Sequence, residues 1–324
     1  MSPGKLDASK RDLPIHFGGR PFTTIRAGEF VISDPVETRI PELSTVSISL
    51  YVPEQPIAII TCHELAVSTN FVGRGNTFKH RKTKMSATSS WYFLSGIDVQ
   101  AEESAIAVVA LGDSITDGMS STQDANRRWP DVLAVRLQND PELRHVAVLN
   151  AGIIGNRVLR DEIGPNAIAR FDRDVLRRPG VKCLVLLEGI NDIDWIRSDE
   201  NVSDSAELIS GLRKLIERAH SETLFVIGGT IPPYGGAEGF IDRGNSIRHA
   251  VNTWYRTENV VDGIADFDQA LRNPEQPDKL DSKYDSGDHV HPNDAGYAAM
   301  AMSINLELIR SCAEGHDSPM QRRR

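Results

Sequence analysis

The sequence predicts an α/β protein, in which a parallel sheet carries helices on both faces and follows a smaller β-rich domain. From about residue 105 onward, short apolar runs alternate with amphipathic helical patterns, which is typical of a parallel sheet built from strand–helix–strand units. Before residue 100 the chain instead shows short β-prone runs separated by Pro, Gly and Asp. The predicted domains are residues 1–100 and 101–314, with a flexible tail at 315–324.

The length and net charge of the chain limit the kinds of protein that it can be. The chain has 324 residues, enough for a substantial core, and a formal net charge of −9. No long basic patch interleaves with aromatics, so nucleic acid is not an expected partner. No apolar stretch approaches the ~20 residues of a membrane helix, and the first residues lack the apolar core of a signal peptide. As written, the chain is expected to be cytoplasmic, with secretion left open if the natural N-terminus is missing.

The cysteines predict neither a disulfide framework nor a zinc site. Cys62, Cys183 and Cys312 are widely spaced and odd in number. Cys183 lies in the apolar run VKCLVLLEG and is expected to be a small core residue.

Three runs predict strands in the N-terminal region: residues 30–36, 46–53 and 57–61. In the second run, apolar residues alternate with polar ones, as in a strand with one face exposed to solvent. Residues 70–90 are polar and basic, which favours a flexible loop over the alternative of a basic lip above an active site. The apolar run from Trp91 to Leu94 is expected to pack between the two domains.

The second predicted domain, residues 101–314, contains five strand patterns and five helical patterns in alternation. The strands are expected at residues 105–111, 146–150, 183–187, 224–227 and 260–264. The helices are expected at residues 128–138, 167–175, 207–220, 246–255 and 293–311.

Ser114 is a candidate nucleophile. The unbroken apolar run from Ala105 to Leu111 predicts a strand buried on both faces, and it stops at Gly112-Asp113-Ser114. Open α/β proteins bind ligands at the carboxyl ends of their strands, and a helix that starts there favours developing negative charge. Gly, Asp and Ser are also ordinary turn residues, so this tripeptide alone is weak evidence.

Three further stretches occur downstream in the order NAGIIGN from Asn150, EGIND from Glu188 and GDHVHPN from Gly287. With the Ser114 turn they resemble the four sequence blocks of the SGNH, or GDSL-type, hydrolases, over residues 105 to about 308. The resemblance implies a flavodoxin-like three-layer α/β/α sheet, the SGNH hydrolase fold. It also implies ester hydrolysis, a reaction that needs no cofactor.

The four blocks supply the parts of a serine hydrolase. His291 is the candidate base for Ser114, and Asp288 can hold the imidazole tautomer and stabilise the imidazolium. The resemblance assigns the oxyanion donors to the backbone N–H groups of Ser114 and Gly155 and to the side-chain amide of Asn191. Some of these residue types also fit simpler roles. Gly155 suits a backbone that must approach the substrate closely, although Gly152 fits a simple turn equally well. Asp113, Asn191 and Asp192 can each brace a loop.

His289 and His291 also form a His-x-His pair that could bind a metal together with Asp288. We favour the catalytic triad, because a serine at a strand end and an asparagine donor have no role in such a site. His289 is expected to neighbour the site without taking part in it.

The N-terminal region resembles the later part of the β-domain that precedes the catalytic domain in one branch of these hydrolases. Further strands are expected upstream in that branch, so either part of the domain is missing here or the remaining strands close differently. An incomplete sheet exposes an edge, which a partner subunit could cover. The sequence therefore allows a homo-oligomer formed through the N-terminal β-segment.

The leading hypothesis is a serine ester hydrolase for short acyl esters, including acetyl groups on a sugar or another polar alcohol. The expected partner is a small-molecule ester or an acetylated carbohydrate. Loops 118–127 and 194–205 are polar, which favours short acyl chains. A non-catalytic carbohydrate-binding protein is the alternative from another class, and the joint presence of all the site residues argues against it. An acyltransferase or thioesterase with the same residues stays open.

Overall fold

The computed structural model describes residues 12–54, 60–76, 84–194 and 204–315. The chain divides into two compact units, Met1–Val52 and Pro53–Arg324, which are described separately. Residues 53–100 thus belong to the same unit as the parallel sheet, and the domain boundary near residue 100 stays a prediction. The predicted tail, apart from Gly315, lies outside the described residues.

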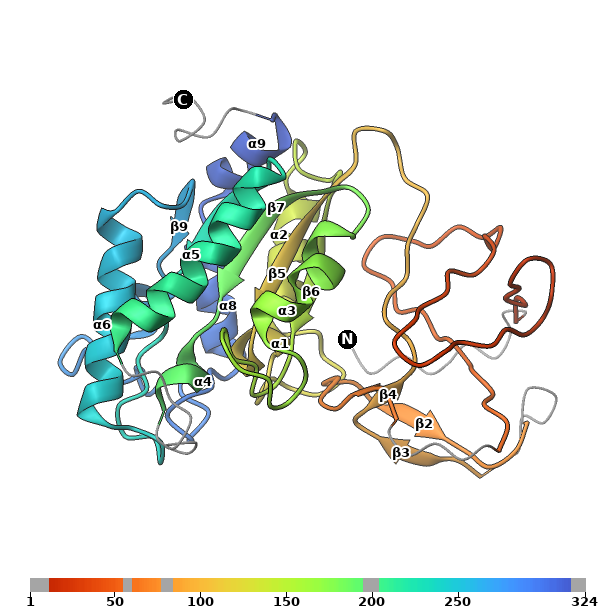
Figure 1. Ribbon diagram of the computed structural model, residues 1–324, viewed down its shortest axis with the longest axis horizontal. Helices are drawn as coiled ribbons and strands as arrows, with labels where there is room; N and C mark the ends of the chain where they lie inside the picture. Colours follow the sequence, from red (N-terminus) through yellow and green to blue (C-terminus); the bar gives the residue numbers. More distant parts are fainter. Residues whose placement is uncertain (1–11, 55–59, 77–83, 195–203, 316–324) are drawn as a thin grey trace. The chain divides into compact units, whose positions relative to one another are not determined.

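A five-stranded parallel sheet forms the centre of the second unit (Figure 1). Its strands are β5 (Ile106–Gly112), β6 (Val146–Gly152), β7 (Val181–Leu187), β8 (Phe225–Gly229) and β9 (Gly263–Ala265). The order across the sheet is β6-β5-β7-β8-β9, the doubly wound order of flavodoxin-like proteins. From Ala107 onward every residue of β5 is buried, which agrees with its unbroken apolar sequence. The predicted fold class is confirmed.

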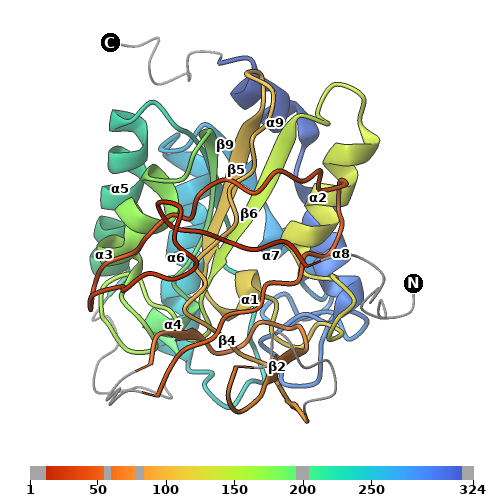
Figure 2. The ribbon, with the colours of Figure 1, turned by 90° about the vertical axis from the view of Figure 1, so that its right-hand side faces the viewer.

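Helices form a layer on each side of this sheet (Figure 2). One layer contains α3 (Ala167–Phe171), the π-helical segment η1 (Asp172–Leu176), α5 (Ser205–Ser221) and α6 (Asp242–Thr257). The other contains α2 (Trp129–Asn139), α7 (Phe267–Leu271), α8 (Asp294–Ser303) and α9 (Leu306–Ala313). The short helices α1 (Ser114–Asp117) and α4 (Ile190–Ile193) follow β5 and β7. No helix in the described part of the chain is long and apolar enough to cross a membrane.

The last predicted helix, 293–311, is two helices in the structure. The α-helical path stops after Ser303, and Ile304 and Asn305 have extended backbones. The side chain of Asn305 accepts a hydrogen bond from the backbone N–H of Glu307 and so starts α9 as a new helix. Periodicity alone could not locate this break, because apolar residues continue on both sides of it.

The structure pairs Cys183 in β7 with Cys312 in α9 as a disulfide, with 6.1 Å between their Cα atoms. This disulfide corrects the expectation, drawn from the wide spacing and odd number of the cysteines, that the sequence implies no disulfide framework. The two residues are 129 positions apart, and only the packing of α9 against β7 brings them together. Cys62 is a free, exposed thiol.

Residues 53–100 contribute two small antiparallel sheets, which confirms the β-rich region ahead of the parallel sheet. β1 (Cys62–His63) pairs with β4 (Trp91–Tyr92), and β2 (Asn70–Val72) pairs with β3 (Ser86–Thr88). The most basic part of the predicted loop 70–90 falls outside the described residues, as do residues 57–59 of the third predicted strand.

Residues 12–52 contain one isolated antiparallel bridge, between Phe17 and Arg20, and no strand. The strands predicted at 30–36 and 46–53 are therefore absent from this described segment. Apolar side chains here remain exposed, for example Ile32 at 72% and Leu50 at 50%. A β-prone sequence forms a strand only when a neighbouring backbone pairs with it, and no such pairing occurs in this segment.

Candidate active site

Three neighbouring strands of the sheet each carry one predicted block to the same edge, where their carboxyl ends lie. Ser114 follows β5, Gly155 follows β6 and Asn191 follows β7. Because β6, β5 and β7 are adjacent and parallel, their carboxyl ends meet, and α1 and α4 begin there (Figure 1). The alternation of strands and helices in the sequence was sufficient to predict this convergence.

Ser114, His291 and Asp288 form a continuous hydrogen-bonded chain. The Oγ atom of Ser114 lies 2.8 Å from Nε2 of His291. Nδ1 of His291 lies 2.6 Å from Oδ2 of Asp288. Ser114 is buried, at 4% exposure. A backbone hydrogen bond from the N–H of Ser286 to the carbonyl of His291 holds the loop that carries His291. The structure thus brings together the three residues of the predicted triad.

Asp288 is held in its ionised form. Partial burial alone would raise the pKa of Asp288, but hydrogen bonds from the ring and backbone N–H of His291 and from the backbone N–H of Val290 outweigh it. The pKa of Asp288 is therefore lowered from its ordinary value. An ionised carboxylate against Nδ1 fixes the proton on that nitrogen and leaves Nε2 facing Ser114 as the basic atom.

The two candidate glycines of the second block, Gly155 and Gly152, occupy positions with different structural constraints. Gly155 has φ +68°, a backbone conformation that favours glycine. Gly152 ends β6, and a Cβ at that position would come within 2.2 Å of the backbone nitrogen of Asp117. Asn191, 8% exposed, donates one side-chain N–H to the carbonyl oxygen of Asn156 at 2.9 Å. A hydrogen bond thus links the third sequence block directly to the second.

Asp113 and Asp192 both brace loops, as predicted. Asp113 caps α1 by accepting from the backbone N–H of Ile115 at 2.9 Å, and Asp192 accepts from the N–H of Val158 at 2.9 Å. Burial raises the pKa of Asp113 to about 7 and that of Asp192 to about 6. For Asp113, the hydrogen bond from the backbone N–H of Ile115 and the charge of Arg170 act in the opposite direction but do not cancel the effect of burial.

His289 pairs with a carboxylate of its own. Its Nδ1 lies 2.5 Å from Oδ2 of Asp285, and its backbone has φ +65°. The ring is half exposed and lies beside Gly236. Among the residues that the structure describes, no group of three or more His, Cys, Asp or Glu side chains is arranged to hold a metal ion. The two histidines of the His-x-His pair thus face different partners.

Sequence reasoning missed a link between the N-terminal region and the site. Nε2 of His63 in β1 lies 2.8 Å from Oδ1 of Asp117, the last residue of α1. The other oxygen of Asp117 accepts from the backbone N–H of Ile154, the residue before Gly155. Burial would lower the pKa of His63, but the hydrogen bond to Asp117 outweighs it, so that pKa is raised. No signal in the sequence relates His63 to a residue 54 positions away.

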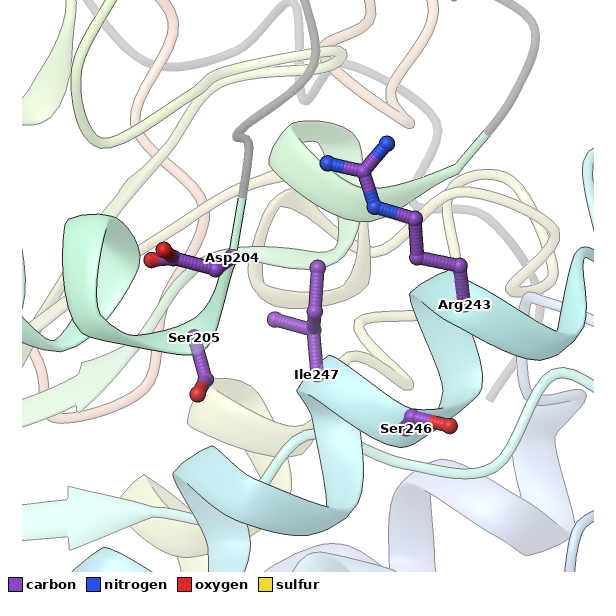
Figure 3. A pocket seen from close by; sticks show the side chains of 5 residues that line it. All are labelled: Asp204, Ser205, Arg243, Ser246 and Ile247. Carbon is purple, nitrogen blue, oxygen red and sulfur yellow. The ribbon is translucent and has the colours of Figure 1, made fainter.

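Residues 195–203 of the polar loop 194–205 lie outside the described part of the chain. Its end faces α6 across a pocket of about 250 Å³, lined by Asp204, Ser205, Arg243, Ser246 and Ile247 (Figure 3). These are mainly polar side chains around one aliphatic residue. The pocket lies between the starts of α5 and α6.

Solved structures of ester hydrolases resemble this chain at low identity. A member of the lipolytic G-D-S-L family from Veillonella parvula is 22% identical, covering 61% of this chain and 96% of that one, with a TM-score of 0.43. The aryl esterase of M. smegmatis is 17% identical over 64% of this chain and 100% of that one (TM-score 0.48). An acetylxylan esterase from Geobacillus stearothermophilus is 20% identical over 63% and 94% (TM-score 0.46).

A search of the curated proteins finds no significant match to the chain. The model of the GDSL-like lipase/acylhydrolase family matches residues 110–299, more than half of the chain. That range contains the Ser114 turn, the blocks after β6 and β7, and the His291 loop. The chain therefore belongs to the GDSL-like lipase/acylhydrolase family and is an ester hydrolase.

Proposed function

We propose that the protein hydrolyses short-chain acyl esters of polar alcohols, acetylated carbohydrates among them, with Ser114 as nucleophile. The observation that carries the proposal is the chain from Ser114 to His291 to Asp288, with separations of 2.8 and 2.6 Å. These are hydrogen-bond distances suited to proton transfer from the hydroxyl to Nε2.

The proposed reaction has two halves. In the first, Nε2 of His291 takes the proton of Ser114 as Oγ attacks the acyl carbon, and the imidazolium then gives that proton to the departing alcohol. In the second, water loses a proton to Nε2 and attacks the acyl-serine ester, which releases the carboxylic acid and restores the hydroxyl. Asp288 stabilises the imidazolium in both halves, which is consistent with its lowered pKa.

The negative oxygen of each tetrahedral intermediate needs donors, and we assign them to the N–H groups of Ser114 and Gly155 and to the amide of Asn191. A side-chain amide has two N–H donors, and Asn191 uses one on the carbonyl of Asn156. The second can serve the oxyanion.

The preference for short acyl chains rests on the polar character of the loop after α1. Thr122 donates its backbone N–H and hydroxyl to the Asp294 carboxylate, and Asp124 accepts both groups of Thr69. A loop fixed by such pairs offers little apolar surface to a long chain. The test is a panel of purified esters that vary the acyl chain and the alcohol; release of acid from short acyl esters supports the proposal, and no hydrolysis of any ester by folded protein overturns it.

A further inference from the structure

Arg170, a buried side chain with no direct access to a substrate, contacts the ends of all three strands that carry the site. Its side chain is 0% exposed. Nη2 donates to the carbonyl of Gly112 at the end of β5, at 2.9 Å, and Nη1 donates to the carbonyl of Ala151 in β6, at 2.6 Å. Nη2 also lies 3.2 Å from Oε1 of Glu188, which directly follows β7.

The guanidinium of Arg170 makes two further hydrogen bonds. Nε donates to the side-chain oxygen of Asn156 at 2.9 Å, and Nη1 donates to Asp174 at 3.2 Å. A guanidinium has five N–H donors, so these contacts match its full capacity. Arg170 itself is held at the end of α3, whose N-cap Asn166 accepts from Ala169, and is followed by the π-helical segment η1. Local π-helical geometry occurs frequently at functional sites.

Four of these five acceptors, all except Asp174, lie within a few residues of a proposed oxyanion donor. Gly112 precedes Ser114 by two residues, Asn156 follows Gly155, and Glu188 precedes Asn191 by three. The carbonyl of Asn156 also receives the side chain of Asn191. A displacement of Asn156 would therefore move the second and third donors together.

We propose that Arg170 is the positioning residue of the oxyanion site, and that it fixes the relative placement of the Ser114, Gly155 and Asn191 donors by joining the ends of β5, β6 and β7. The inference rests on the proposed function. Its physical basis is that oxyanion donors accelerate a reaction only when they are already aimed at the developing charge. Arginine suits this role because its planar fork makes several directed hydrogen bonds at once, whereas a lysine ammonium has three donors on one atom.

The test compares Arg170→Lys with Arg248→Lys. Arg248 is also 0% exposed and donates to Asn245, Asp268 and Asp278, all outside the blocks that carry Ser114, Gly155 and Asn191. It is a matched control for the loss of a buried, carboxylate-paired arginine. For each variant we would measure kcat, KM, melting temperature and inhibition by a short alkyl trifluoromethyl ketone. The serine oxygen adds to the carbonyl carbon of this ketone, and the carbonyl oxygen becomes a tetrahedral oxyanion.

Arg170→Lys is expected to lower kcat about 10²- to 10³-fold, the usual effect of losing an oxyanion donor. Inhibition by the ketone should weaken by a comparable factor, with KM close to that of the wild type. Arg248→Lys should retain kcat and ketone affinity. A folded Arg170→Lys enzyme with wild-type kcat, or equal losses of kcat in both variants, overturns the inference. Wild-type protein that hydrolyses no ester contradicts the proposed function instead.

If Arg170→Lys does not fold, Asn156→Ala provides the second test. This change removes the acceptor of Nε but keeps the backbone carbonyl that receives Asn191. It is expected to lower kcat and ketone affinity together, by about 10-fold or more, because the hydrogen bond between Arg170 and the side chain of Asn156 is lost. Wild-type kcat in folded Asn156→Ala protein overturns the inference.

Discussion

His291 Nε2 lies 2.8 Å from Ser114 Oγ, although the two residues are 177 positions apart in sequence. Ser114 lies at the start of α1, directly after β5, and His291 lies in the loop before α8. Two hydrogen bonds join Asp288 to His291, because the carboxylate accepts from both the ring and the backbone of the histidine. The pair therefore presents a preset base to the serine.

The roles of the two histidines give the first prediction. Ser114→Ala and His291→Ala should each lower kcat/KM for a short-chain p-nitrophenyl ester by about 10⁴- to 10⁶-fold. His289→Ala should keep substantial activity, because its ring pairs with Asp285 rather than with the serine. The measurement is steady-state kinetics, with circular dichroism to confirm folding. Greater loss in His289→Ala than in His291→Ala would contradict the triad assignment.

Asp288→Asn should have an intermediate effect. An amide in place of the carboxylate leaves the base present but no longer fixes its tautomer or stabilises the imidazolium, so kcat is expected to fall about 10²- to 10⁴-fold. The same kinetic assay measures this, with Asp285→Asn as the matched control at the neighbouring His289 pair. A loss in Asp285→Asn as large as that in Asp288→Asn would speak against the distinction between the two pairs.

Acyl chain length provides the third prediction. A longer chain gains affinity by burying methylenes, at about 0.8 kcal/mol each, and the polar pairs of Thr122 with Asp294 and of Thr69 with Asp124 offer little surface for that. Acetyl to butyryl esters should therefore be turned over faster than octanoyl esters. A p-nitrophenyl ester series decides the matter, and a kcat/KM maximum at octanoyl or longer chains would refute the preference.

Asp113 gives a prediction on pH and stability. Burial raises the pKa of Asp113 from 3.8 to about 7, so between these values the folded protein keeps a proton that the unfolded chain has lost. Stability from this group is present at low pH and declines as the pH rises toward 7, by about 1.4 kcal/mol per pH unit at most. Asp113→Asn keeps the acceptor for Ile115 but removes the titration.

Urea unfolding of the wild type and Asp113→Asn at several pH values tests this. The variant should become more stable relative to the wild type as the pH rises from about 4 to about 7. A difference in free energy of unfolding that does not change with pH would contradict the expected titration of Asp113.

The disulfide gives the fifth prediction. Cys183 and Cys312 are 129 positions apart, and a cross-link over that separation restricts the unfolded chain. Cys312→Ala should lower the free energy of unfolding by up to about 4 kcal/mol, and a reductant should destabilise the wild type but not the variant. Cys62→Ala is the control, because that thiol is free. Three titratable thiols in unfolded, unreduced protein would show that the disulfide is absent.

The sequence was sufficient to predict the parallel sheet and the convergence of the four blocks, because buried strands have unbroken apolar runs and parallel strands place their ends together. It could not identify Arg170, which lies in an ordinary helical pattern and acts through carbonyl groups that every residue has. Nor could it relate His63 to Asp117, or Cys183 to Cys312, since each pair meets only after packing. The strands predicted at 30–36 and 46–53 do not form, for a related reason. Their sequence is β-prone, but the described segment supplies no partner strand.

The central claim is that Ser114 is the nucleophile, and covalent labelling tests it most directly. The protein would be treated with a serine-directed organophosphonate, and the labelled peptide would be identified by mass spectrometry while residual ester hydrolysis is followed in parallel. We predict one label per chain, on Ser114, with loss of activity in proportion to labelling and no labelling of Ser114→Ala. A label on another residue that tracks the loss of activity, or full activity in protein labelled at Ser114, would contradict the account.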